Sequence, residues 1–426
     1  MNRSLFSAMI VGALGLMISL STLAHAYPGQ KEYGKEATIS LQQAEKVALK
    51  TFPGKIVSEE LEKEKGGSGL RYSFDVGDGK AVHEIGIDAK TGAVLENSTE
   101  IEAVKPKSSA SIKQPTAKIA LPGGKQGIGF DDMGYFPQLR RVVVPAAQTG
   151  DLDLINPKTY AATVISDVAA KHAAPNGDDP GSTSVAYGDG YLFAGDHGNH
   201  SVAIVNPRSK RVVGHVKLAA DYDFVRYLAS RHELWVTEPG KHRIEIFEQV
   251  KKTPPTFRHK AFIAVPDGPE ALVFDSATDR AYTDERSGST VAISLSKRAI
   301  VARWPNSCQQ SRGLARDGQL LFVACREGAV AVLDTAHNGK RVGKIKTGTG
   351  VDLIAYDSAH HRLFVPGAKS ATLTVMHVSP DGHLRRTAVY RTVKGAHCVA
   401  AANDGKAFVC DPKHGRLLVI APHGGA

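Results

Sequence analysis

The chain has 426 residues, of which 42% are hydrophobic and 23% are charged. This length is too great for one small domain and is enough to bury a large core. The net charge of +10 suggests an acidic partner or an anionic surface, but Lys and Arg are scattered and form no basic stripe interleaved with aromatic residues, so we do not expect nucleic-acid binding.

The first 26 residues have the pattern of a signal peptide. Arg3 supplies a positive charge, residues 5–20 form an apolar stretch, and Ala24-His25-Ala26 is a small-x-small cleavage site. An uncleaved membrane anchor is the alternative, although the apolar stretch is short for a membrane span of about 20 residues. No later segment is apolar enough to cross a bilayer. We therefore expect a periplasmic or secreted protein in an oxidising compartment.

Residues 34–100 are expected to form a small α+β domain. Ser40 and Gln43 have the spacing of a capping box ahead of a helix that ends at Pro53-Gly54. One face of this helix carries Leu41, Ala44, Val47, Ala48 and Phe52. Three alternating stretches follow, KIVSEELEKE, LRYSFDVG and AVHEIGIDA, and glycine-rich turns join them. The pattern predicts a helix packed on a small antiparallel sheet.

This segment resembles the PepSY domain over nearly its whole length. The resemblance rests on ISLQQAEKVALKTFPGKIV, on RYSFDV and on IGIDAKTGAVLE with its turn from Asp88 to Gly92. Members of that family occur in propeptides and exported proteins and are thought to bind or restrain partners, often peptidases. The resemblance implies a binding role and no catalytic residues; a spacing or stabilising domain is the alternative.

Residues 101–115 are rich in Lys, Ser, Ala and Pro and are expected to be a flexible tether. A second pattern begins after this tether. Residues 261–305 contain four alternating stretches closed by turn residues, as expected for a four-stranded antiparallel sheet. Similar copies recur at intervals of about 40 to 52 residues through 116–422. One such sheet cannot bury both faces, so seven copies predict a mainly β protein with a seven-bladed β-propeller.

The two ends of this array predict how the ring closes. The last copy has only three strands, CVAAA, KAFVCD and RLLVIAP, whereas Ala117 to Pro122 mirrors the outer strand of another copy. Pairing this first segment with the last copy would remove open sheet edges. An open β-array is the alternative.

The array looks like the YVTN-type bacterial β-propellers, which are similar to the propellers of lactonases and haem d1 enzymes. The copies HRLFVPGAKSATLTVMHV and ELWVTEPGKHRIEIFE carry the resemblance, whereas the Tyr-Val-Thr-Asn core of the family is degenerate here. The resemblance implies a fold; the chemistry must be argued from a site.

The four cysteines lie at matching ends of neighbouring strands in two copies. We predict two disulfides within blades, Cys308 with Cys325 and Cys398 with Cys410. A four-thiolate metal site is disfavoured because blade six separates the pairs and no C-x-x-C spacing occurs. Free thiols are the remaining alternative.

The starts of the inner strands are the candidate ligand-binding residues, because they ring one mouth of the central channel. They are Asp131, Thr183, Asp223, Glu270, Arg312, Asp352 and His397. The ends of the second strands are expected on the same face, and they add Asp196, His197, Glu238, Asp284, Glu285, Arg326 and Asp411, with His200, His242 and His414 nearby. Titratable groups at the axis suggest a binding site, although such residues also line plain solvated channels.

Three functions fit these residues. We favour an exported binding or interaction protein, monomeric, whose propeller face and PepSY domain contact a partner protein or a small ligand of the cell envelope. A metal-dependent, lactonase-like hydrolase using the acidic ring is the first alternative, with His197, His397 and His414 as candidate metal ligands. A redox propeller carrying a cofactor is the second. The sequence identifies no cofactor and no catalytic residue, because it lacks a G-x-S-x-G elbow, a P-loop, a Rossmann glycine pattern and C-x-x-C-H.

Overall fold

The computed structural model describes residues 30–422, except 65, 78–81, 101–111 and 172–180. The predicted signal peptide at 1–26 and most of the predicted tether at 101–115 lie outside the described residues. The chain divides into two compact units, Met1–Thr99 and Glu100–Ala426. Among the described residues, no helix is both long enough and apolar enough to span a membrane.

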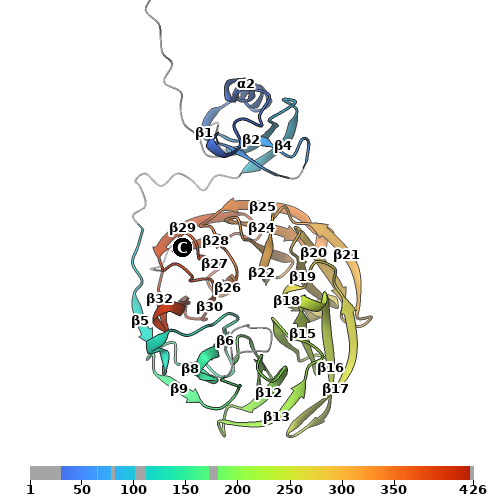
Figure 1. The fold of residues 1–426 in the computed structure, drawn as a ribbon, viewed down its shortest axis with the longest axis vertical. Helices are drawn as coiled ribbons and strands as arrows, with labels where there is room; N and C mark the ends of the chain where they lie inside the picture. Colours follow the sequence, from blue (N-terminus) through green and yellow to red (C-terminus); the bar gives the residue numbers. More distant parts are fainter. Residues whose placement is uncertain (1–29, 65, 78–81, 101–111, 172–180, 423–426) are drawn as a thin grey trace, which may run out of the picture. The chain divides into compact units, whose positions relative to one another are not determined.

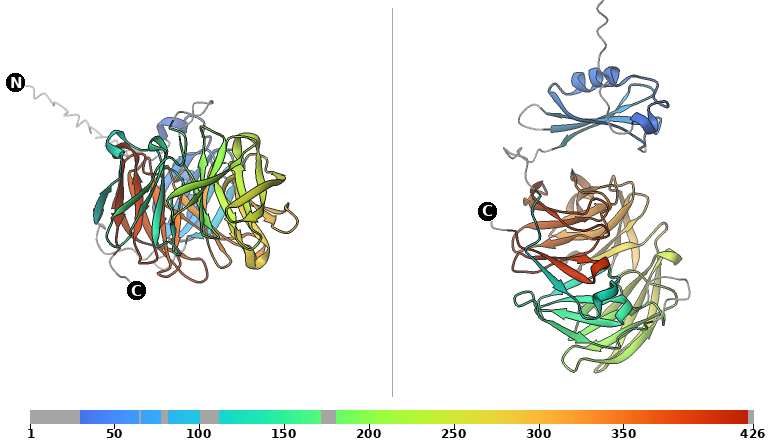
Figure 2. Two further views of the ribbon diagram at one scale, coloured as in Figure 1. Left: turned by 90° about the horizontal axis from the view of Figure 1, so that it is seen from below. Right: turned by 60° about the vertical axis from the view of Figure 1, so that its left-hand side comes forward.

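The first unit has a short helix followed by a longer helix that packs on a four-stranded antiparallel sheet. Its elements are α1 (Gln30–Tyr33), α2 (Leu41–Thr51), β1 (Lys55–Glu62), β2 (Arg71–Gly77), β3 (Val82–Asp88) and β4 (Val94–Glu100). The sheet order is β1-β2-β3-β4, and α2 lies across one face (Figure 2). The predicted capping box is confirmed: Ser40 accepts from the Gln43 amide, and the Gln43 side chain accepts from the Ser40 amide. Leu41, Ala44 and Ala48 are buried against the sheet.

The strand β4 was not predicted as a separate element. It reads VLENSTE, an edge strand with little apolar alternation, so its sequence lacks the strand signal of its neighbours. The turn before it is built around Asp88, whose carboxylate accepts from the amides of Ser68, Lys90 and Thr91. Although burial opposes ionisation, these hydrogen bonds hold the pKa of Asp88 well below its usual value. Gly92 completes the turn at φ 75°.

The second unit is a ring of seven four-stranded antiparallel sheets, which confirms the predicted seven blades (Figure 1). From inner to outer strand, blades one to four are β6 (Gly134–Phe136), β7 (Arg141–Ala146), β8 (Asp151–Ile155), β9 (Ala162–Ile165); β10 (Val185–Gly188), β11 (Tyr191–Asp196), β12 (Ser201–Asn206), β13 (Arg211–Lys217); β14 (Val225–Leu228), β15 (Glu233–Glu238), β16 (Arg243–Lys252), β17 (Pro255–Ala264); and β18 (Glu270–Asp275), β19 (Arg280–Glu285), β20 (Ser289–Ser294), β21 (Ala299–Pro305).

Blades five to seven complete the ring. They are β22 (Ser311–Asp317), β23 (Leu320–Cys325), β24 (Ala329–Asp334), β25 (Lys340–Lys346); β26 (Ala355–Asp357), β27 (Arg362–Gly367), β28 (Thr372–Val378), β29 (Leu384–Arg391); and β30 (Val399–Ala401), β31 (Ala407–Asp411), β32 (Arg416–Ile420) with β5 (Ala117–Ala120). The strand β5 pairs with β32, with Ile119 opposite Leu417, as the two ends of the array predicted. The ring is therefore closed by its first and last strands.

The core of the ring lies between blades. Clusters of buried side chains join strands of neighbouring blades; one of them contains Leu228, Trp235 and Ile246 of blade three and Leu272 and Val291 of blade four. Hydrogen bonds also join blades where the inner strands end. The hydroxyl groups of Tyr135, Tyr227 and Tyr356 donate to Asn403, Asp189 and Asp317 of the preceding blades over 2.8, 2.7 and 2.6 Å. These contacts fix the inner strands around the channel.

Candidate functional site

The seven predicted mouth residues lie at equivalent places around the channel. Five of them lie two or three residues before an inner strand, Glu270 begins β18, and Arg312 is the second residue of β22. Six of the seven are partly exposed, whereas Glu270 is buried, with 5% of its surface exposed. The inner-strand starts therefore face a common, accessible opening.

Three of these residues are aspartates whose pKa values are raised above the usual value. Burial, and after it the nearby charge of Asp352, raises the pKa of Asp131 well above its usual value. Burial, and after it the charge of Asp131, also raises the pKa of Asp223 well above its usual value. Burial also raises the pKa of Asp352, although His397 and Arg312 oppose the shift. Carboxylates from blades one, three and six are thus close enough to repel one another.

Arginine and histidine side chains offset part of this negative charge. Glu270 forms ion pairs with Arg286 and with Arg312, the latter at 2.7 Å. The Nε2 atom of His397 lies 3.6 Å from Asp131 Oδ1, and its Nδ1 donates to the Gly395 carbonyl over 2.7 Å. Glu270 is therefore neutralised by two cations, whereas Asp131, Asp223 and Asp352 are not paired with an arginine at salt-bridge distance in the described part of the chain.

A cavity of about 310 Å³ lies behind this mouth, inside the channel. The residues that directly follow four of the mouth acids line it: Asp132, Phe224, Ala271 and Leu353. Its wall is otherwise mainly apolar and aromatic, with Tyr135, Phe136, Tyr187, Tyr227 and Tyr356 among the lining residues. The channel combines a polar, acidic entrance with an aromatic interior, which is the composition of a small-molecule site.

One ion pair crosses this channel, and the sequence analysis missed it. Arg226 of blade three donates from Nη1 and Nη2 to the Asp132 carboxylate of blade one, and from Nε to the Leu272 carbonyl of blade four. Ser184 of blade two also donates to Asp132 over 2.6 Å. Since the Arg226 guanidinium is already occupied by these acceptors, it is poorly placed to bind an anionic ligand. Its position inside an inner strand gave no sign of this cross-channel contact.

The acidic residues at the ends of the second strands are buried and hydrogen-bonded, unlike most residues at the inner-strand starts. Asp196 accepts from the Ala170 amide and the Asn199 side chain, Glu238 from Arg243, and Asp411 from His414 and Arg416. Glu285 accepts from Arg303, and Asp284 from Thr290. All five carboxylates are at most 5% exposed. These carboxylates therefore stabilise turns and strand ends. Arg326 lies near the mouth, where its charge acts on Asp352.

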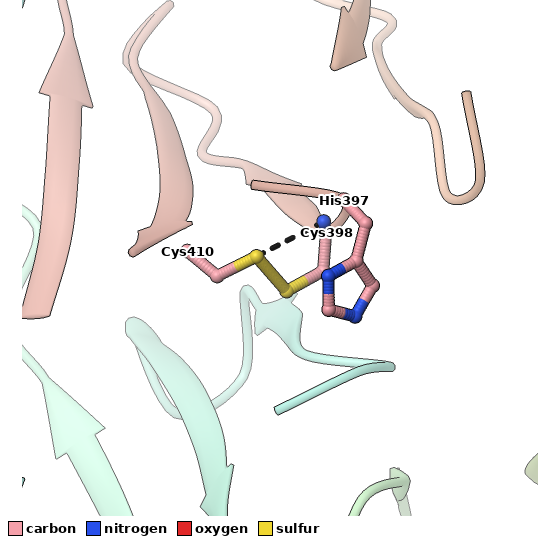
Figure 3. Close-up of side chains that lie close together, drawn as sticks. All are labelled: His397, Cys398 and Cys410. Carbon is pink, nitrogen blue, oxygen red and sulfur yellow. Dashed lines mark hydrogen bonds between the residues drawn. A yellow bond between two sulfur atoms is a disulfide. The ribbon is translucent and has the colours of Figure 1, made fainter. Parts of the chain in front are cut away.

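The three histidines proposed as metal ligands do not come together. His197 contacts Thr183 and Asp221, His397 contacts Asp131 and the Gly395 carbonyl, and His414 contacts Asp411. His242, which was expected near the mouth, is exposed on the turn after β15. Within the described ranges, the two groups with the spacing of a metal site are His397 with Cys398 and Cys410, and Glu327 with Cys308 and Cys325. Both cysteine pairs form the predicted disulfides, and Figure 3 shows His397 beside one of them. A disulfide lacks the thiolates that bind metal.

The first unit has a second charged feature on its sheet. Arg71 is buried, with 7% of its side chain exposed, and it contacts four glutamates. Its Nη2 atom lies 2.5 Å from the Glu64 carboxylate and 3.6 Å from that of Glu84. Its Nη1 atom lies 2.9 Å from the Glu96 carboxylate, and its Nε atom lies 3.5 Å from that of Glu62. Arg71, Glu62 and Glu84 lie on successive strands across the sheet, whereas the helix packs on the opposite, apolar face with Tyr72 and Phe74. The sheet thus has one apolar face and one acidic face.

Comparison with known proteins supports both folds. Residues 38–97 match the PepSY family, described as "Peptidase propeptide and YPEB domain". No curated protein matches the chain. Similar solved structures include "Crystal Structure of Mitotic Checkpoint Complex" (12% identity, TM-score 0.60, covering 79% of this chain and 100% of that one) and "Kuenenia stuttgartiensis Hydrazine Synthase" (13%, 0.57, 71% and 98%). The Cps50 (Swd1) β-propeller domain of Myceliophteria thermophila is another (11%, 0.57, 73% and 99%).

At these identities the solved structures show the fold alone, and the YVTN subtype is not confirmed. The family match covers the first unit and the structural matches cover the greater part of the chain, as expected for the propeller. The protein therefore has an N-terminal PepSY domain and a seven-bladed β-propeller, two folds that suggest a binding or interaction role.

Proposed function

We propose that this protein is an exported binding protein whose propeller takes a small ligand at the channel mouth, while the PepSY domain contacts a partner in the cell envelope. On this proposal residues 1–26 are a cleaved signal peptide, 34–100 and 116–422 are the two domains, and the propeller is of the YVTN type. The PepSY match and the two disulfides are consistent with an extracellular location.

The observation that supports this proposal most strongly is the cluster of Asp131, Asp223 and Asp352 at the starts of the inner strands, where the next residue of each strand lines the cavity. A ligand that matches both parts has a positively charged group beside the aspartates and an apolar body in the channel. Aromatic faces also attract cations, which favours the same ligand. A primary alkylamine that carries an aromatic ring is therefore the chemical class that we propose.

Binding of such a ligand should depend on pH. The pKa values of the three aspartates are raised, so protons compete with the cation for the carboxylates. The affinity should rise as the pH rises through these raised values, and binding should release protons. Calorimetry in two buffers with different ionisation enthalpies measures that release. Affinity that is constant between pH 5 and pH 8 would count against the aspartates as ligands.

The first experiment compares matched probes on the full chain. Phenethylamine should bind in native mass spectrometry and calorimetry, whereas phenylacetate, its anionic counterpart, should not. Asp131→Asn and Asp352→Asn should weaken binding at least about 10-fold, which corresponds to about 1.4 kcal/mol. Asp167→Asn is the control, because its side chain is 83% exposed. Equal binding of both probes, or unchanged binding by the mouth variants, would refute the proposed site.

A further inference from the structure

A hydroxyl and an imidazole of blade two and a carboxylate at the start of blade three form a chain of hydrogen bonds at the channel mouth. Thr183 Oγ1 lies 2.8 Å from His197 Nε2, and His197 Nδ1 lies 2.7 Å from Asp221 Oδ1. An ionised carboxylate accepts hydrogen bonds only, so the Nδ1 atom carries the proton. The Nε2 lone pair then faces the Thr183 hydroxyl, and this is the arrangement in which an imidazole can remove a hydroxyl proton.

Three separate segments hold this chain of contacts in place. Thr183 precedes β10, His197 directly follows β11, and Asp221 lies between β13 and β14, where the next blade begins. The His197 amide donates to the Gly181 carbonyl over 3.0 Å, and the imidazole stacks on Tyr222 with 4.1 Å between ring centroids. With 7% exposure, His197 has little room to rotate. Its second nitrogen is therefore aimed at Thr183 by the fold.

This arrangement differs from the other histidine–aspartate pairs of the propeller. His337, His360 and His414 each contact an aspartate three residues earlier in the same turn, and they are 71, 38 and 46% exposed. Those pairs stabilise turns. In the part of the chain that the structure describes, His197 alone has a carboxylate on one ring nitrogen and a hydroxyl on the other. A turn-stabilising role therefore does not account for it.

A proton donor lies beside Thr183. The Thr183 amide donates to the Tyr222 hydroxyl over 3.3 Å, and burial raises the pKa of Tyr222, so this phenol stays protonated. A group that remains protonated can donate a hydrogen bond to a developing oxyanion. A nucleophile, its base and a candidate donor thus meet at an accessible opening.

We infer that Thr183 is the nucleophile of an esterase-type site in which His197 is the general base and Asp221 the positioning residue. Thr183 Oγ1 attacks the carbonyl carbon of a carboxylic ester, and its proton passes to His197 Nε2. The carbon–oxygen bond to the alcohol breaks, and the alcohol leaves with that proton. Water then attacks the acyl-threonine through the same base, which releases the acid and restores Thr183. The sum is ester plus water giving acid plus alcohol.

A covalent probe tests the nucleophile directly. A fluorophosphonate should form a phosphorus–oxygen bond with Thr183 and release fluoride, and peptide mass spectrometry should locate the adduct. Thr183→Val and His197→Gln should each lower the labelling rate and the hydrolysis of p-nitrophenyl acetate at least about 100-fold. Thr183→Ser keeps a hydroxyl and should remain reactive. His360→Gln is the matched control, because it removes a histidine–aspartate pair from a turn of another blade.

The outcomes also separate this inference from the ligand-binding proposal. Thr183→Val retains the size of the side chain, and circular dichroism shows whether it folds; phenethylamine binding is measured on the wild-type chain. Absence of a Thr183 adduct in a chain that binds phenethylamine would overturn the esterase site alone. A Thr183 adduct in a chain that binds no amine would retain the esterase site and refute the amine ligand. Labelling that persists in His197→Gln would overturn the assigned base.

Discussion

At the scale of single residues, Asp153 is an unusual side chain of the propeller. It lies on β8, is 1% exposed, and neither carboxylate oxygen has a hydrogen-bond partner among the described residues. Burial, and after it the charge of Asp151, raises the pKa of Asp153 to about 7. Because the folded state favours the neutral acid, Asp153 penalises folding increasingly as the pH rises from about 4 to about 7.

Asp153→Asn should remove this penalty. The variant should be more stable than the wild type at pH 8, by at most about 4 kcal/mol for a shift of about three pKa units, and the difference should shrink towards pH 4. Unfolding midpoints measured at several pH values check this prediction. Asp167→Asn provides the comparison, because the Asp167 side chain is 83% exposed and its charge is not a cause of the shift. A wild type and an Asp153→Asn variant that respond identically to pH would contradict it.

At the scale of elements, each disulfide links the beginning of an inner strand to the end of its neighbour. Cys308–Cys325 spans 17 residues in blade five, and Cys398–Cys410 spans 12 in blade seven. The sulfur atoms are buried, so the pairs are parts of the blades and not surface links. Closing a loop of about 15 residues stabilises a fold by about 3 kcal/mol, mainly because the unfolded chain loses conformational freedom.

Replacing both cysteines of one pair by serine should therefore lower stability by about 2 to 4 kcal/mol. Denaturant midpoints of the Cys308→Ser/Cys325→Ser variant, measured without reductant, test this loss. Reduction of the wild type should lower its midpoint further, because it opens both links. A double variant with the wild-type midpoint would mean that blade five does not depend on its disulfide.

At the scale of the whole molecule, the propeller depends on the contact between β5 and β32. Ile119 of β5 is 6% exposed and belongs to the same buried cluster as Leu417 of β32, although almost 300 residues separate them. No covalent bond closes the ring at this point in the described structure, since the disulfides lie within blades five and seven. Burial of a few side chains thus protects the edge of the last blade.

Ile119→Ala should weaken this closure by about 2 to 5 kcal/mol. Hydrogen exchange should accelerate first in β5 and β32, because the last blade loses its outer strand before the other blades open. Lys118→Ala is the control, because Lys118 is exposed on the same strand. Exchange that accelerates equally in all seven blades would show that opening at this contact is not a local event.

The sequence by itself determined the elements and their order. Polar and apolar alternation with turn residues identified the blades, the Ser40–Gln43 spacing identified the helix start, and the incomplete last copy identified the ring closure. These features depend on local propensity and repetition, which a linear chain displays directly. Even so, the polar edge strand β4 escaped detection, because its pairing with β3 contributes more than its own apolar pattern.

Only the tertiary structure decided which polar residues act together. Asp153 has the alternating pattern of an exposed position, yet both faces of a propeller strand are covered by neighbouring blades. Arg226 reaches Asp132 across 94 residues, and Asp221 reaches His197 from the start of the next blade. Such contacts depend on the closure of the ring, which sets distances between blades that no spacing along the chain records.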